Sequence, residues 1–179
     1  MACRIGKIEA KIILLLLDAY PQGAAEMDHK GHLPLHLLLK HHNTVPMDVV
    51  KRLFEINPKG LPDGMTSVLD EVFHWRTNYK GRVGVVKSLL EKCPEQASHK
   101  SSDGLPIHTA CKVNTMYPEA LLQLLSAYPQ GAKEPDSKGV LPLDLLVEHV
   151  SDPEVVMNRL LELYPQSLQH RSNSGELTL

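Results

Sequence analysis

Pairs of adjacent apolar residues recur along the chain at intervals of 35 to 37 residues. Four residues before each pair stands a second pair that is also mostly apolar, so both pairs lie on the same face of an α-helix. The later pairs are Leu16-Leu17, Leu53-Phe54, Leu89-Leu90, Leu124-Leu125 and Leu160-Leu161, and the earlier pairs are Ile12-Ile13, Val49-Val50, Val85-Val86, Ala120-Leu121 and Val156-Met157. The pattern predicts five amphipathic helices of about three turns each, which we call the outer helices.

Eleven of the thirteen prolines occupy three kinds of position on the same grid. One kind follows each outer helix, where the residue before a proline avoids the α-helical conformation and the helix ends. A second kind stands just before the outer helices, in the first helical turn, where the missing N–H is not needed. A third kind begins a second helix in the repeat, which we call the inner helix. These three sets are Pro21, Pro58, Pro94, Pro129 and Pro165; then Pro46, Pro118 and Pro153; then Pro34, Pro106 and Pro142.

A short connector precedes the inner helices. It contains an Asp-x-x-Gly turn at residues 28–31 and 136–139, and shorter or altered versions at 63–64, 103–104 and 172–175. Glycine supplies the positive φ that such a turn needs, and aspartate caps its own turn. Each repeat therefore reads turn, helix, loop, helix. One such unit cannot bury its apolar face, whereas stacked neighbours can.

The segment Leu105-Pro106-Ile107-His108-Thr109-Ala110 resembles the Thr-Pro-Leu-His-x-Ala signature of the ankyrin repeat. The resemblance implies an all-α solenoid of stacked helix-turn-helix repeats, with a period near 36 residues. Residues 1–179 would form a single array with units at approximately 1–21, 22–58, 59–94, 95–129, 130–165 and a partial unit at 166–179. Leucine replaces the family's threonine at positions 33, 105 and 141, which removes a helix cap of about 1 kcal/mol.

Composition narrows the class of partner. Basic and acidic residues number 19 and 21, so there is no basic excess of the kind that nucleic acids or anionic membranes require. The longest apolar run, residues 12–17, is far shorter than a membrane span, and three scattered cysteines suggest a reducing compartment. We expect a protein of the cytoplasm or nucleus, either a monomer or part of a longer chain.

Two clusters raise the question of chemistry. Five histidines lie within residues 29–42, and His29, His32 and His36 could supply three nitrogen ligands to a metal. His108 and Cys111, three residues apart on a predicted helix, could be a base and its nucleophile. In the ankyrin-like pattern, however, His36 and His108 are the histidines expected to hydrogen-bond between repeats, and Cys111 fills a small packing position. We therefore predict no catalytic residue, no metal site and no cofactor.

The remaining hypothesis is recognition through a surface. In the family, the turns and the exposed side of the inner helices form a concave partner-binding face. Carried over to this chain, the face would present His32, Lys40, His41, Lys112, Val140, Glu148 and His149. Trp75, close to Phe73 and Tyr79, is either a binding hot spot or a packing residue beside a shortened connector.

These residues predict a non-catalytic scaffold that binds another protein. Basic residues outnumber acidic ones 12 to 9 in positions 1–90, whereas acidic ones outnumber basic ones 12 to 7 in positions 91–179. The partner is accordingly expected to carry the opposite order of charge. Two alternatives stay open: a metal-dependent enzyme or small-molecule binder built on a helical solenoid, and a structural spacer within a larger protein.

Overall fold

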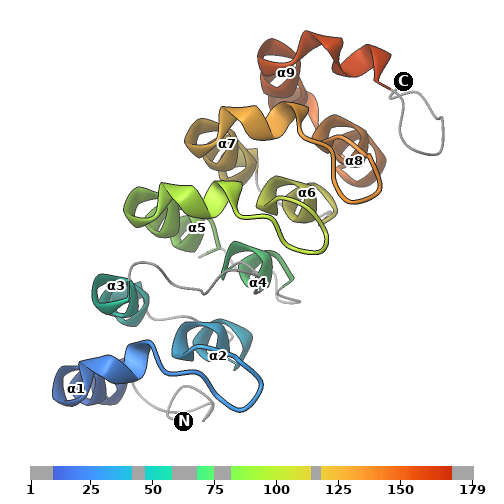
Figure 1. The fold of residues 1–179 in the computed structure, drawn as a ribbon. Helices are drawn as coiled ribbons and strands as arrows, with labels where there is room; N and C mark the ends of the chain where they lie inside the picture. The colour runs from blue at the N-terminus through green and yellow to red at the C-terminus, as the bar shows by residue number, and fades with distance from the viewer. Residues whose placement is uncertain (1–9, 42–46, 58–67, 75–81, 114–117, 171–179) are drawn as a thin grey trace. The chain divides into compact units, whose positions relative to one another are not determined.

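The computed structural model describes residues 10–41, 47–57, 68–74, 82–113 and 118–170; the side chains of residues 39–41, 47, 54, 71, 74 and 82 are not described. The chain divides into two compact units, residues 1–93 and 94–179. Within the described residues all the regular structure is helical, and the only β feature is an isolated bridge between Ser101 and Gly104. The predicted all-α class is confirmed (Figure 1).

The N-terminal unit packs outer helices on outer helices and inner helices on inner helices. Helix α1 contacts α3, α3 contacts α5, and α2 contacts α4. The elements are α1 (Ala10–Ala19), the 3₁₀ helix η2 (Pro21–Ala24), α2 (Pro34–His41), α3 (Met47–Ile56), α4 (Val68–His74) and α5 (Arg82–Lys92). The helices ending before Pro21, Pro58 and Pro94 therefore lie where the apolar pairs predicted them.

The C-terminal unit repeats the arrangement, with α6 against α8 and α7 against α9. Its elements are η3 (Pro94–Ser98), α6 (Pro106–Cys111), α7 (Pro118–Ala127), η4 (Pro129–Lys133), α8 (Pro142–His149), α9 (Glu154–Leu163) and η5 (Pro165–Gln169). Pro106, Pro118 and Pro142 each stand at the first residue of a helix, as the sequence predicts. Pro153 lies one position earlier, as the N-terminal flanking residue of α9.

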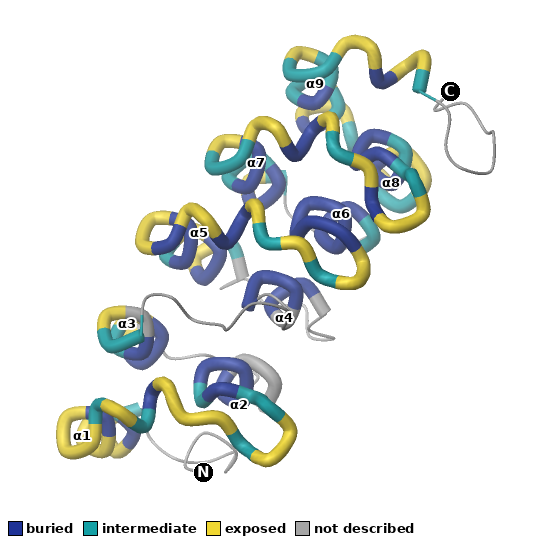
Figure 2. The backbone as a smooth tube through the Cα atoms, viewed as in Figure 1, coloured by how far each residue is buried: buried dark blue, intermediate teal, exposed yellow. Residues whose placement is uncertain are grey.

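The core of each unit lies between its helix layers and consists of most residues of the predicted apolar pairs together with leucines of the inner helices. Ile12 and Leu16 of the pairs are exposed, and Met157 and Leu161 are only partly buried. Val49, Val85, Leu121 and Leu125 are fully buried (Figure 2). Burial of one such side chain contributes about 1.5–3 kcal/mol, so packing rather than helix propensity stabilises these short helices. Among the described helices, none is both long and apolar enough to cross a bilayer.

A 3₁₀ turn begins at the proline that follows each of four outer helices, and this turn was not predicted from the sequence. Prolines 21, 94, 129 and 165 end one helix and also stand at the first position of η2, η3, η4 and η5. The residue before the proline lies outside the α-helical region at Tyr20, Tyr128 and Tyr164, with φ between −139° and −146° and ψ between 76° and 80°. Each proline therefore redirects the chain sharply and starts the connector towards the next inner helix.

Candidate functional site

Two connectors carry the same rigid turn. In each turn, an oxygen of the aspartate side chain accepts backbone N–H groups two and four residues later, from Lys30 and His32 to Asp28 and from Lys138 and Val140 to Asp136. Gly31 and Gly139 both adopt φ 80°, a conformation that residues with a Cβ rarely take. The predicted Asp-x-x-Gly turns are thus confirmed at both positions.

A third turn, Ser101–Gly104, has serine in place of the aspartate and packs tightly against the next turn. Ser101 and Gly104 exchange backbone hydrogen bonds, and Gly104 has φ 107°. A Cβ built on Gly104 would lie 3.0 and 3.2 Å from the Cβ and Cα of Asp136 and 2.9 Å from Nδ1 of His108. Glycine is therefore required here both by the backbone conformation and by the closeness of the following turn.

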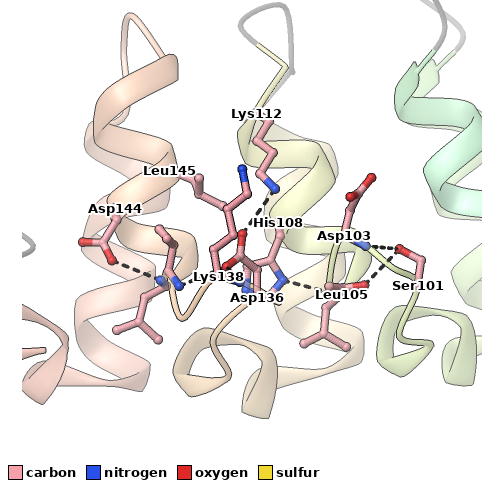
Figure 3. Close-up of polar contacts among 12 residues, drawn as sticks. Ser101, Asp103, Leu105, His108, Lys112, Asp136, Lys138, Asp144 and Leu145 are labelled. Carbon is pink, nitrogen blue, oxygen red and sulfur yellow. Dashed lines mark hydrogen bonds and ion pairs between the residues drawn. The ribbon is translucent and has the colours of Figure 1, made fainter. Parts of the chain in front are cut away.

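His108 lies at the centre of the contacts in Figure 3. Its Nδ1 accepts the backbone N–H of Leu105 at 3.0 Å, so its Nε2 carries the proton and donates to the backbone carbonyl of Glu134 at 2.9 Å. The hydrogen bond expected of His108 is present and joins residues 26 positions apart. Burial lowers the pKa of His108, and this effect exceeds the opposite effects of the Glu134 carbonyl and the Asp136 carboxylate.

The same capping position is used in all three inner helices that open with proline. His36 Nδ1 accepts the N–H of Leu33 at 3.1 Å, and Asp144 Oδ2 accepts the N–H of Leu141 at 3.0 Å. Leucine at positions 105 and 141 forms no side-chain cap. The side chain three residues later instead satisfies the leucine's own N–H, which is half of a capping box.

Asp136 joins the turn to helix α6. One carboxylate oxygen holds its own turn, and the other lies 3.3 Å from Nζ of Lys112. Burial alone would raise the pKa of Asp136, but the N–H groups of Val140 and Lys138 and the Lys112 ammonium together hold that pKa below its ordinary value. Lys112, predicted as a partner-binding residue, is therefore also a fixed part of the fold.

The other predicted binding residues are distributed over both units. Val140 ends the second turn. Glu148 and His149 lie together at the C-terminal end of α8, with side chains 71% and 35% exposed. His32 belongs to the first turn, where its Nδ1 lies 3.3 Å from Asp28. The structure therefore places Lys112, Val140 and Asp136 in one network, with Glu148 and His149 on the neighbouring helix.

Three predicted residues fall outside the description. Trp75 lies outside the described residues, and the side chains of Lys40 and His41 are not described although α2 extends to His41. Phe73, which could have formed a hot spot with Trp75, is only 1% exposed. That burial favours the packing role for this aromatic residue over the recognition role.

Among the residues considered for a metal site or for catalysis, His36 and His108 have structural contacts within the fold. Within the described part of the chain, no group of three potential ligands is close enough to hold a metal ion. His36 uses Nδ1 as a cap, and its ring is tilted at 6.5 Å from that of His32. Cys111 is fully buried, which raises its thiol pKa to about 12, and both nitrogens of His108 have backbone partners. The pair His108 and Cys111 is therefore not arranged as base and nucleophile.

A hydrogen bond between a tyrosine and a glutamate occurs in each unit and was not predicted from the sequence. The hydroxyl of Tyr20 donates to Glu26, and that of Tyr128 donates to Glu134, six residues later in both cases. Lys100 adds an ion pair to Glu134 at 2.7 Å, and these contacts lower the pKa of Glu134. The signal was available, because the five residues Tyr-Pro-Gln-Gly-Ala occur identically at 20–24 and 128–132 with glutamate at the same distance.

The sequence matches no known family profile, and it has no significant match among curated proteins.

Proposed function

We propose that the chain is an ankyrin-like solenoid that binds another protein through its turns and the exposed ends of its inner helices, without catalysis. The observation that carries this proposal is the network around Asp136. It holds the turn 136–139 and helix α6 in one arrangement through Lys112, and the same turn leads directly into α8. A surface that is fixed before binding loses little conformational entropy when a partner docks.

The chemistry of this surface suits recognition. Lys138 on the turn and Glu148 on α8 are exposed, and His149 is half-exposed beside Glu148. Charged and aromatic polar groups on a rigid frame select a partner by complementary charge more than by apolar area. The partner of the C-terminal unit is accordingly a protein surface with a basic group facing Glu148.

Affinity capture with two matched variants tests the proposal. Glu148→Lys on inner helix α8 and Glu162→Lys on outer helix α9 make the same charge change at side chains that are 71% and 66% exposed. The immobilised protein is incubated with a lysate of its source cells, and bound proteins are quantified by mass spectrometry. We expect at least one protein to be retained equally by the wild type and Glu162→Lys and about tenfold less by Glu148→Lys.

Two results would count against the proposal. Equal retention by both variants would show that the inner-helix face is not the binding surface. Capture of nothing above the level of a blank resin would favour the structural spacer.

A further inference from the structure

Helix α1 exposes two apolar positions that the other outer helices bury. Ile12 is 47% exposed, whereas the residues nine positions before the proline in the other repeats, Val49, Val85, Ala120 and Val156, are 0–1% exposed. Leu16 is 50% exposed, whereas the residues five positions before the proline, Leu53, Leu89, Leu124 and Leu160, are 0–2% exposed. Figure 2 shows the exposed positions along α1. Ile12 and Leu16 thus have the apolar character of an interface that none of the described residues covers.

A pocket of about 260 Å³ lies in the same unit. It is lined by residues of the α1 terminus, η2, the first turn and α2, among them Tyr20, Gly23, Glu26, Asp28, His32 and Leu37. Met27 also lines the pocket, and the exposed fractions of Tyr20 and Met27 are 53% and 40%. We call this pocket, together with the exposed face of Ile12 and Leu16, the α1 groove.

The C-terminal unit shows what fills the equivalent space there. A Cβ built on Gly131 of η4 would lie 3.6 Å from Leu105 Cδ1 and 3.7 Å from Ile107 Cγ2, both at the start of α6. At Gly23, the corresponding residue of η2, the nearest atoms among the described residues belong to the ring of Tyr20, in the same connector. Among the described residues, none takes against η2 the position that α6 takes against η4.

The receiving connector has the same geometry in both units. The tyrosine-to-glutamate hydrogen bond, the two N–H groups on the turn aspartate and the glycine at φ 80° are shared by residues 20–32 and 128–140. In the C-terminal unit this connector offers α6 two polar contacts, the Glu134 carbonyl to His108 and the Asp136 carboxylate to Lys112. The equivalent groups in the α1 groove belong to Glu26 and Asp28.

We propose that the α1 groove binds a single helix of a partner protein, whose first turn reads apolar, proline, apolar, histidine and which carries a basic residue four positions after the histidine. The apolar residues would pack on Gly23, Leu16 and Ile12. The histidine N–H would donate to the carbonyl of Glu26, and the basic residue would pair with Asp28. The packing on Gly23, the histidine contact and the basic residue are copied from contacts that α6 makes to η4 and the second turn, whereas the packing on Leu16 and Ile12 is inferred from their exposure. This mode is helix-in-groove recognition.

This inference does not depend on the proposed function. Its surface lies in the N-terminal unit, whereas the variants that test partner binding through the inner-helix face lie in the C-terminal unit. Failure of one experiment therefore leaves the other intact.

The probe is a synthetic peptide with the sequence of residues 101–113, acetylated and amidated, titrated into the full-length protein and followed by fluorescence anisotropy of a terminal dye. A free peptide of this length is only marginally helical, so we expect saturable binding with a Kd of about 10⁻⁴ M. A peptide with alanine at the position of His108 should bind about fivefold more weakly, because the contact to the Glu26 carbonyl is lost.

Two variants on α1 form a matched pair. Leu15 and Leu16 are adjacent and 59% and 50% exposed, but only Leu16 occupies a position that is buried in every other outer helix; Leu15 aligns with Arg52, Ser88, Gln123 and Arg159. Leu16→Glu should weaken peptide binding at least about tenfold and Leu15→Glu less than about twofold. Equal circular dichroism spectra of the two variants would show that both stay folded.

Three results would overturn the proposal. One is the lack of saturable binding up to about 1 mM peptide. Another is equal binding of a scrambled peptide. The third is a concentration-dependent dimer of the wild type that Leu16→Glu abolishes, measured by sedimentation, because the occupant would then be a second copy of this chain.

Discussion

Replacement of His108 should reveal how much one side chain contributes by joining two repeats. In His108→Ala, the N–H of Leu105 and the carbonyl of Glu134 both lose their partner. Each lost hydrogen bond costs about 1 kcal/mol, and a buried group left unsatisfied costs about 1–3 kcal/mol. Because His108 is fully buried, truncation also leaves a cavity. We expect a loss of about 3–5 kcal/mol in the free energy of unfolding.

His108→Asn separates the cap from the bridge. Its short side chain still places an oxygen near the N–H of Leu105, as Asp144 does for Leu141, but it is too short to reach the carbonyl of Glu134. The asparagine variant should therefore be about 1 kcal/mol more stable than the alanine variant, which is the usual value of a cap.

The pH dependence has a definite sign. An unfolded imidazole titrates near pH 6.5, and burial lowers the pKa of His108 below that value in the folded protein. Below about pH 6.5 the unfolded chain therefore binds more protons at this residue than the folded chain does. The stability contributed by neutral His108 is fully present above about pH 7.5 and is lost as pH falls through 6.5 towards the folded pKa. The slope reaches at most about 1.4 kcal/mol per pH unit.

Urea unfolding followed by far-ultraviolet circular dichroism between about pH 5.5 and pH 8 measures both effects. Both His108 variants should show a shallower pH slope than the wild type. Thr109→Val, on the same helix and with no titratable group, should keep the wild-type slope. The reasoning is refuted if His108→Asn retains that slope in full, or if His108→Ala costs less than about 1 kcal/mol.

Two further predictions concern α6 and its turn. Gly104→Ala should destabilise the protein by about 2–4 kcal/mol, because Gly104 has φ 107° and the new Cβ would meet the backbone of Asp136. Gly84→Ala, in an exposed helical position with open space, should instead stabilise the protein by up to about 1 kcal/mol. Unfolding free energies of the two variants within about 0.5 kcal/mol of each other would contradict this prediction. Thr109 is buried and its hydroxyl has no partner among the described residues, so Thr109→Val should raise the unfolding free energy by about 1 kcal/mol in the same assay, and a lower value would show that the hydroxyl is satisfied in solution.

The helices and the turns could be predicted because their determinants are local. Paired apolar residues four positions apart define one helical face, and proline and glycine restrict φ at fixed places, whatever surrounds them. Helices α7 and α8 accordingly begin at the predicted Pro118 and Pro142. The 3₁₀ turns were not predicted, because the sequence pattern indicated only that the prolines after the outer helices end those helices.

The candidate site was less predictable because its contacts join distant residues. Lys112 and Asp136 are 24 positions apart, and His108 reaches a carbonyl 26 positions away. The repeat pattern identified His108 as structural, but no local rule indicates that Lys112 is held by a carboxylate. For Glu148 and His149 the sequence predicted a place on an inner helix, and the structure adds that they remain accessible.

The capping contacts explain how three inner helices can begin after a leucine, which has no capping side chain. Leu33, Leu105 and Leu141 are 2%, 0% and 0% exposed. Burying a leucine contributes about 1.5–3 kcal/mol, which exceeds the roughly 1 kcal/mol of the lost cap. The exchange is favourable only if the leucine N–H still finds an acceptor, and the side chain three residues later supplies it.

That requirement restricts the residue three positions after the leucine. Histidine and aspartate both accept the N–H, but only a neutral histidine also has a proton to donate to the next connector. His108 therefore caps α6 and bridges to Glu134, whereas an ionised Asp144 can cap α8 but cannot donate to a carbonyl. In α6 the histidine thus accompanies a next connector that is packed against the helix. This is also why the helix proposed for the α1 groove must carry a histidine rather than an aspartate.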